Sequence, residues 1–108
     1  MIEISVMRQD DGKVIGLSIE GHSGTAERGH DIVCAGVSAL AQSVILSLAN
    51  HLHRKITYDV NSKSGSLNVA LTELPDELTE AVFSVALAGF AEIAKNYPRN
   101  VALEDIRR

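Results

Sequence analysis

The sequence predicts an α+β fold, a two-layer sandwich in which two long helices cover one face of a mainly antiparallel or mixed sheet. Two pairs of segments show apolar residues at every second position, and two longer segments show them at helical spacing. Short polar or glycine-containing stretches separate these segments. The expected order is ββ-α-ββ-α-β. Because 108 residues suffice for one compact core, we expect a single domain over residues 1–108.

The first strand pair is expected before residue 21. Apolar residues alternate over Ile2–Val6 and again at Ile15, Leu17 and Ile19, and Asp10-Asp11-Gly12 lies between the two runs. Alternation on both sides of a turn sequence is typical of a β-hairpin with one buried face.

The first long helix is expected to begin after Asp31, which is a good N-cap residue. A row of apolar residues at helical spacing follows and predicts about five turns. Its members are Val33, Val37, Leu40, Ala41, Val44, Leu48 and Leu52.

The second half of the chain repeats this plan. Ile56–Val60 and Leu67–Leu71 alternate around the turn sequence 61–66, and Pro75-Asp76 opens a second helix that Pro98 ends. Val101 and Leu103 indicate a short final strand. The expected buried face of the second helix consists of Leu78, Val82, Val85, Gly89, Ile93 and Tyr97.

Three apolar residues fall outside these helical rows. Ile45, Leu87 and Phe90 widen the apolar faces beyond what one sheet covers. Such a face often marks a subunit contact, and we therefore expect a homodimer; a large buried helix in a small domain is the equally good alternative.

Composition excludes several classes of function. The formal charge is −4, Trp is absent and Phe and Tyr number two each, which argues against a phosphate-backbone or base-stacking surface and so against direct nucleic-acid binding. No apolar run is expected to approach the roughly 20 residues that span a bilayer, so no membrane contact is expected. The single cysteine cannot form an internal disulfide, and a cytoplasmic location is expected.

Cys34 is the main candidate for a catalytic nucleophile. With Asp31 as N-cap, it lies in the first helical turn, where backbone N–H groups and the helix dipole favour the thiolate. The same N–H groups can stabilise an oxyanion. The negative charge of the Asp31 carboxylate disfavours the thiolate, so the cap and the helix dipole shift the thiol pKa in opposite directions. From its position alone, Cys34 can equally well be a small core residue at the edge of the apolar row.

His22 is the expected base for this thiol. It follows the second strand at the start of a glycine-containing stretch, and a strand end beside a helix start can bring the two side chains together. His30 is a rival, as a base, a peptide contact or a solvated side chain. Without Cys34 nearby, His22 would more readily be interpreted as a loop histidine without a role.

The surrounding residues suggest supporting functions. Ser38 lies one turn after Cys34, and its hydroxyl can bond to the thiolate, to the histidine or back to the helix. The glycines Gly24 and Gly29 bound a segment that is expected to close over a peptide, with Glu27, Arg28 and His30 as candidate substrate contacts. His22, His30, Asp31 and Cys34 lack paired metal-ligand spacing, so no metal or other cofactor is expected.

Residues 21–40 resemble the signature of the bacterial ribosomal-processing cysteine proteases, the Prp family. The resemblance lies in Gly21-His22, the glycine-containing stretch, and Gly29-His30-Asp31-Ile32-Val33-Cys34-Ala35-Gly36-Val37-Ser38-Ala39-Leu40. The resemblance implies a homodimeric α+β fold and a cysteine–histidine dyad of Cys34 and His22, with Asp31 and Ser38 close by. It also implies one substrate, the short N-terminal extension of a large-subunit ribosomal protein. The expected function is therefore a cysteine endopeptidase of ribosome maturation.

Two other functions remain open on the sequence. A non-catalytic assembly factor would bind the ribosomal protein tail without cutting it and would leave Cys34 incidental. A different thiol chemistry, such as acyl transfer or redox sensing, is the third; the lack of a second cysteine argues against disulfide exchange.

Overall fold

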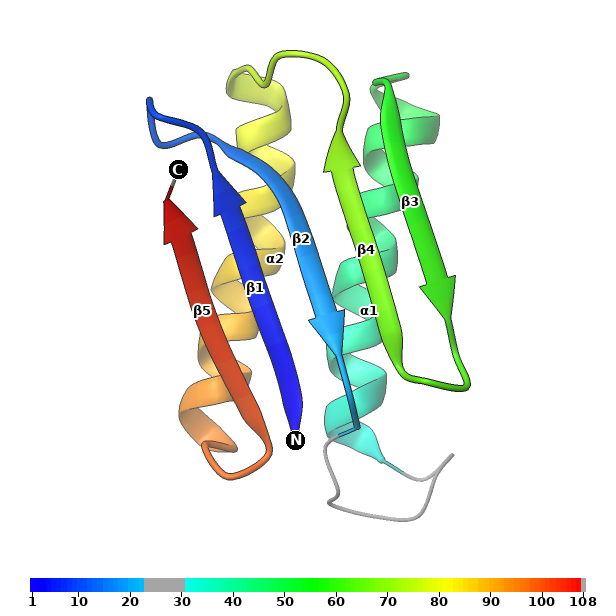
Figure 1. Ribbon diagram of the computed structural model, residues 1–108, viewed down its shortest axis with the longest axis vertical. Coiled ribbons are helices and arrows are strands. Elements are labelled where there is room, and N and C mark those ends of the chain that lie inside the picture. Colours follow the sequence, from blue (N-terminus) through cyan, green and yellow to red (C-terminus); the bar gives the residue numbers. More distant parts are fainter. Residues whose placement is uncertain (23–30, 108) are drawn as a thin grey trace.

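The structure, a computed structural model, describes residues 1–22 and 31–107. The chain forms β1 (Ile2–Arg8), β2 (Val14–Glu20), α1 (Ile32–Leu46), a π-helical continuation η1 (Ser47–His51), β3 (Ile56–Asn61), β4 (Ser66–Leu71), α2 (Glu77–Asn96) and β5 (Val101–Arg107) (Figure 1). This order confirms the predicted ββ-α-ββ-α-β arrangement.

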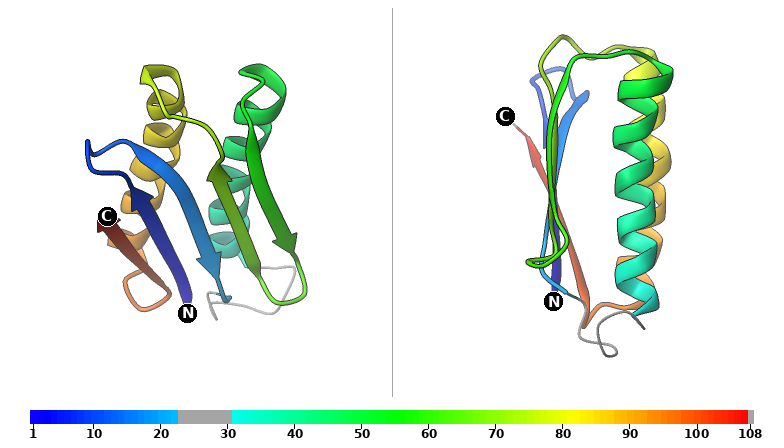
Figure 2. Two further views of the ribbon diagram at one scale, coloured as in Figure 1. Left: turned by 45° about the horizontal axis from the view of Figure 1, so that its top comes forward. Right: turned by 90° about the vertical axis from the view of Figure 1, so that its right-hand side faces the viewer.

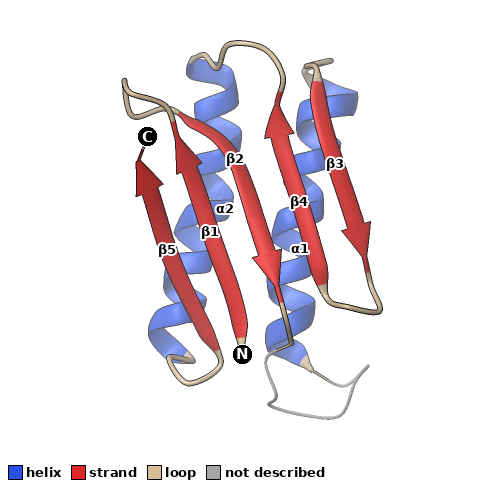
Figure 3. Ribbon diagram, viewed as in Figure 1, coloured by secondary structure: helices blue, strands red, loops and turns tan. Residues whose placement is uncertain are grey.

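Five strands form one mixed sheet in the order β3-β4-β2-β1-β5 (Figure 3). The pairs β1–β2, β2–β4 and β3–β4 are antiparallel, and β1–β5 is parallel. Both helices lie on the same face of the sheet, which gives the two predicted layers (Figure 2). The core fills the space between them. Its largest fully buried side chains are Phe83, Phe90, Ile2, Ile4, Leu17 and Leu48.

The first hairpin departs from simple alternation at one residue. Met7 pairs with Gly16 and Arg8 pairs with Val14, so that Ile15 is the extra residue of a β-bulge. Val14 is fully buried, whereas Ile15 is only half-buried. The prediction that Ile15 belongs to the buried face was therefore wrong, because the bulge shifts the alternation by one position.

Helix α1 begins as predicted. Asp31 is its N-cap, and the buried row of Val33, Val37, Ala41, Val44 and Leu48 packs on the sheet. Residues Ile32–His51 are nevertheless long and apolar enough to cross a membrane, with a mean hydropathy of 2.0. The prediction that no apolar run approaches this length was wrong. The core helix of a globular domain can pass the same test, because the test depends on length and composition alone.

Helix α2 turns a different face to the sheet from the predicted one. Its buried residues are Thr79, Phe83, Ala86 and Phe90, whereas Leu78 and Val85 expose 56% and 70% of their surface. The two rows have almost the same spacing and differ by one residue, so periodicity cannot choose between them. The row that carries both phenylalanines buries more apolar area and faces the core.

The predicted reason for a homodimer fails with this correction. Phe90 and Ile45 are buried within the chain rather than exposed beside its core. What remains uncovered on the helices includes Leu78 and Val85 of α2. Two further residues of the predicted row face α1, since Gly89 lies against Leu40 and Ile93 approaches Gly36.

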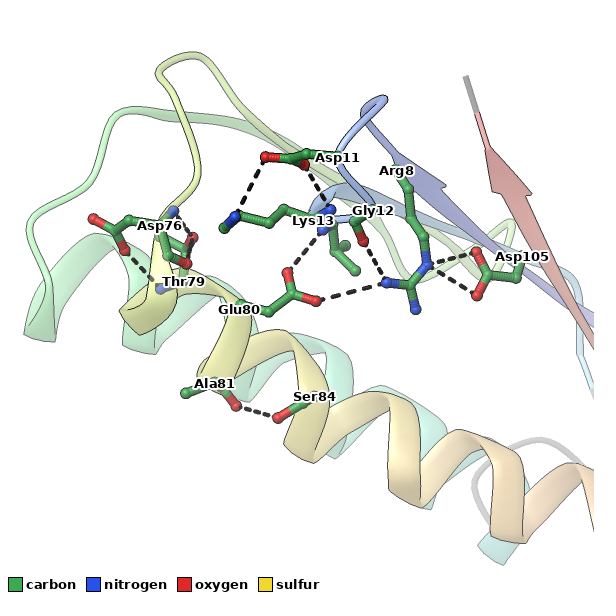
Figure 4. A network of polar contacts seen from close by, with 11 residues as sticks. Arg8, Asp11, Gly12, Lys13, Asp76, Thr79, Glu80, Ala81, Ser84 and Asp105 are labelled. Atoms are coloured by element: carbon green, nitrogen blue, oxygen red, sulfur yellow. Dashed lines mark hydrogen bonds and ion pairs between the residues drawn. The ribbon is translucent and has the colours of Figure 1, made fainter.

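A polar network joins the β1–β2 turn, the start of α2 and β5 (Figure 4). Arg8 donates through Nε to both carboxylate oxygens of Asp105 at 2.9 and 3.0 Å and through Nη1 to the carbonyl of Gly12 at 2.7 Å. Glu80 accepts from the Val14 amide at 2.8 Å. The network lies at the end of the sheet opposite the end of β2 (Figure 1). It holds the hairpin on α2 and leaves the other end of the sheet to the pocket described below.

The N-cap of α2 should make stability depend on acid pH. Asp76 accepts hydrogen bonds from the Thr79 and Leu78 amides and from Arg54 Nη1, and these, the Thr79 bond foremost, hold the pKa of its carboxyl below the ordinary 3.8. The stability it adds is present above the ordinary pKa and is lost as pH falls through the lower pKa of the folded state. Asp76→Asn keeps a cap oxygen but cannot titrate.

We therefore expect the wild-type chain to have the higher melting temperature at pH 6 and this advantage to shrink between roughly pH 4 and pH 2. Thermal unfolding followed by circular dichroism over this range measures it. A gap between the two proteins that stays constant with pH would show that Asp76 is not the titrating group.

Candidate active site

The end of β2 fixes the position of His22. Strand β2 pairs with β1 on one side and β4 on the other, and Ile19 lies opposite both Ile4 and Leu67. Gly21 follows with a φ of +96°, and a Cβ there would collide with the carbonyl of Met1. Only glycine allows this turn. The chain therefore leaves the sheet sharply and places His22 beside the β3–β4 turn.

Gly65 of that turn is in direct contact with the His22 ring. A Cβ on Gly65 would lie 2.5 Å from the Gly21 carbonyl oxygen, 2.9 Å from His22 Cε1 and 3.0 Å from His22 Nε2. Gly65 itself has a φ of +72°. The missing side chain thus leaves space that the imidazole occupies, and the turn acts as a wall against one side of the ring.

The N-terminus of α1 fixes Cys34. The Asp31 carboxylate accepts a hydrogen bond from the Cys34 amide at 2.9 Å, and the Asp31 carbonyl accepts one from Ala35 at 3.0 Å. These bonds complete the first turn and place Cys34 at its third residue, half-buried against the core. The thiol therefore lies in the turn where the positive end of the helix dipole acts. The predictions that Asp31 caps the helix and that Cys34 lies in its first turn are confirmed.

Cys34 and His22 line the same pocket. This cavity of about 180 Å³ opens between the N-terminal turns of α1, the end of β2 and the β3–β4 turn. A closed apolar cavity of about 150 Å³ can hold a benzene molecule, so this space suffices for one peptide side chain. Its walls are Ile2, Ile19, Gly21, His22, Cys34, Val37, Ser38, Ala41, Gln42, Val60, Asn61, Ser62, Gly65, Ser66 and Leu67.

Ser38 lies on the pocket wall, as its spacing from Cys34 predicts. Its Oγ accepts a hydrogen bond from Gln42 Nε2 at 2.8 Å. Gln42 therefore engages one lone pair of the Ser38 hydroxyl, and the hydroxyl hydrogen can still be donated to a neighbouring acceptor.

The other predicted substrate contacts cannot be placed. Gly24, Glu27, Arg28, Gly29 and His30 lie outside the described residues, so their predicted role in closing over a peptide stays a prediction. Among the described residues, no three histidine, cysteine or acidic side chains are grouped closely enough to hold a metal ion.

Sequence reasoning missed one whole wall of the pocket. Val60, Asn61, Ser62, Gly65 and Ser66 come from β3, β4 and their turn, which are far from Cys34 in sequence. The turn is held by Asn61, whose Oδ1 accepts from the amides of Lys63 and Ser64. The sequence of residues 61–66 indicates a turn, but it does not indicate which residues the turn contacts. Only the β2–β4 pairing brings this turn to His22. Gln42 was also missed, although it lies two turns after Cys34.

The fold and this pocket are those of a small α+β protein with a thiol in the first turn of a helix and an imidazole on the wall of the same pocket. The sequence matches the family described as "Cysteine protease Prp" over residues 1–102, and the chain therefore belongs to that family. A protein of Staphylococcus aureus named ribosomal processing cysteine protease Prp is 29% identical over 106 residues, which cover 95% of this chain and 97% of the relative.

Solved structures confirm the fold. The crystal structure of the S. aureus ribosomal processing protease Prp with a covalently linked product peptide superimposes with a TM-score of 0.90 at 24% identity, covering 98% of this chain and 100% of the other. The structure of SMU.848 from Streptococcus mutans gives a TM-score of 0.86 at 26% identity, covering 100% and 96%. The predicted α+β sandwich and the predicted family are both confirmed.

Proposed function

We propose that this cysteine protease removes the short N-terminal extension of a large-subunit ribosomal protein during ribosome maturation. The observation that carries the proposal is the shared pocket of Cys34 and His22, in a chain of the Prp family whose S. aureus relative is named for ribosomal processing. The same relative has been crystallised with a covalently linked product peptide. A pocket that admits one side chain beside a nucleophile is what such a reaction requires.

In the proposed mechanism Cys34 and His22 form a catalytic dyad. His22 takes the thiol proton, and the Cys34 sulfur attacks the scissile carbonyl to form a tetrahedral intermediate. Protonated His22 then gives its proton to the leaving amine as the C–N bond breaks. Water hydrolyses the thioester, which releases the extension and restores the thiol.

Asp31 and Ser38 have supporting roles in this proposal. Asp31 fixes the first turn of α1, but it also accepts the amide hydrogen of Cys34 at 2.9 Å. That amide is therefore engaged in the cap, and we assign the stabilisation of the oxyanion to other amides of the first turn. Ser38 is proposed to donate its hydroxyl hydrogen to the dyad while Gln42 holds its oxygen. Residues 24 and 27–30 are proposed to contact the peptide.

Oligomeric state, location and partners belong to the same proposal. Leu78 and Val85 leave an apolar strip on α2 that supports a homodimer; a monomeric mass in light scattering would refute it. A ribosomal protein as substrate supports a cytoplasmic location, which cell fractionation tests.

The sheet face away from the helices carries the paired, exposed residues Glu3 and Glu20. This acidity supports the absence of direct nucleic-acid contact, which a shift assay with ribosomal RNA would test.

Mass spectrometry of the ribosomal protein with its extension intact tests the function. Cys34 is the only cysteine in the sequence, so iodoacetamide gives a control protein that differs only at the proposed nucleophile. We expect the untreated chain to release one defined N-terminal peptide and the alkylated chain to release none. Cleavage by both would exclude a cysteine nucleophile. Binding without cleavage by either would favour the non-catalytic assembly factor.

A further inference from the structure

Strand β3 forms one open edge of the sheet. In the order β3-β4-β2-β1-β5, β3 pairs only with β4, so one side of its backbone has no neighbouring strand in the described chain. In Figure 1 this edge runs along the side of the molecule that carries α1. An edge strand presents N–H and C=O groups at every second residue to whatever chain approaches it.

The register identifies the residues that present these groups. The Thr72 amide donates to the Lys55 carbonyl at 2.9 Å, which makes the pair of residues 55 and 72 a hydrogen-bonded pair. Hydrogen-bonded and non-hydrogen-bonded pairs alternate in an antiparallel ladder. Ile56, Tyr58 and Val60 therefore belong to non-hydrogen-bonded pairs, and their backbone groups point away from β4 toward the open edge.

The same three residues direct apolar side chains to the helix-covered face. They lie opposite Leu71, Val69 and Leu67, and the last two are buried under the helices. Tyr58 and Val60 nevertheless expose 61% and 46% of their surface, because no further strand covers their flank. Edge strands are usually protected by proline, lysine or a bulge. Residues 56–61 contain no proline and no lysine, and the β3–β4 register runs without a bulge from Ile56 to Asn61.

The open edge leads into the pocket. Val60, Asn61 and Ser62 at the end of β3 are also walls of the cavity that holds Cys34 and His22. An extended chain paired with β3 can therefore continue in the same direction into the pocket that Cys34 lines. Pairing along β3 and reaction at Cys34 can involve one continuous extended segment.

We propose that an extended segment of the peptide substrate binds as a sixth strand on the open edge of β3, with the adjoining residue in the Cys34 pocket. The inference rests on the proposed function and specifies how that site holds its substrate. Strand addition uses backbone hydrogen bonds for affinity and alternate side chains for specificity. Residues that face the helices meet Tyr58 and Val60 and should be apolar. Alternate residues lie beside Thr57 and Asp59 and should be polar, with cations favoured by the Asp59 carboxylate.

The test compares Tyr58→Pro with Tyr58→Thr. Both variants lose the aromatic ring, but only proline loses the N–H that points to the open edge, and proline is tolerated where that N–H makes no bond within the sheet. The probe is a synthetic peptide that covers the ribosomal protein's extension and the first residues after it. We expect KM for this peptide to be about tenfold higher in the proline than in the threonine variant, the effect of one lost hydrogen bond and added steric hindrance.

Cys34 alkylation by iodoacetamide is measured in both variants as a control for the site, and circular dichroism as a control for the fold. Equal alkylation with unequal KM supports strand addition. Equal KM in two folded variants that still cleave overturns it, and leaves the proposed function intact. If light scattering instead shows that only Tyr58→Pro changes the oligomeric state, the edge pairs with a second copy and the inference is wrong. Failure of the wild-type chain to cleave counts against the proposed function itself.

Discussion

Replacing Cys34 by alanine should abolish cleavage of the ribosomal protein extension and leave the fold unchanged. The proposed reaction passes through a bond to the Cys34 sulfur, and loss of a nucleophile of this kind lowers kcat by a factor of at least about 10⁴. The fold should survive because the side chain is only half-buried and the hydrogen bond to Asp31 comes from the backbone amide, which alanine retains. Turnover of the extension peptide and thermal unfolding measure the two effects.

Ser43→Ala is the matched control for this substitution. Ser43 lies on the exposed side of the same helix and its hydroxyl donates to the Ala39 carbonyl at 2.6 Å, so the variant also removes one small polar group from α1. It should retain full turnover. Appreciable turnover by a folded Cys34→Ala protein would place the nucleophile elsewhere and reduce Cys34 to a packing residue.

The local parts of this architecture were accessible from the sequence. Caps and periodicities depend on residues a few positions apart, so Asp31 as N-cap, Cys34 in the first helical turn and the two hairpins could be predicted. His22 and Cys34 are only 12 positions apart, and a strand end followed by a helix start suffices to suggest that they meet. These predictions needed no knowledge of how distant segments pair.

The missed features depend on distant pairing or on a choice between equivalent patterns. Two overlapping apolar rows on α2 made Leu78 and Val85 as plausible for the core as Phe83 and Phe90, and only packing against the sheet decides. The bulge at Ile15 arises from its pairing with β1. Likewise, Gly65 becomes part of the pocket only because β4 pairs with β2 and carries the turn to His22.

Gly65→Ala should lower turnover about 100-fold by displacing the proposed base. The added Cβ would meet the Gly21 carbonyl oxygen at 2.5 Å and the His22 ring at 2.9–3.0 Å. The backbone carbonyl cannot yield as a flexible side chain would, so either the turn or the Gly21–His22 segment must move. A displacement of about 1 Å at a catalytic group can cost this factor of 100. Steady-state kinetics should show the loss in kcat, with the rate of Cys34 alkylation falling as well.

Gly12→Ala separates this displacement from simple backbone strain. Gly12 also has a positive φ, +91° against +72° for Gly65, but lies in the β1–β2 turn at the opposite end of the sheet. Both alanines should cost at least about 1 kcal/mol in stability, because L-residues are strained at positive φ. Gly65→Ala should cost more, because its Cβ also meets the Gly21 carbonyl. Only Gly65→Ala should approach the kinetics of His22→Gln, in which the base is removed. If both alanine variants lose stability alike and keep full turnover, the contact between Gly65 and the imidazole does not position the base, since the ring then tolerates the displacement without loss of rate.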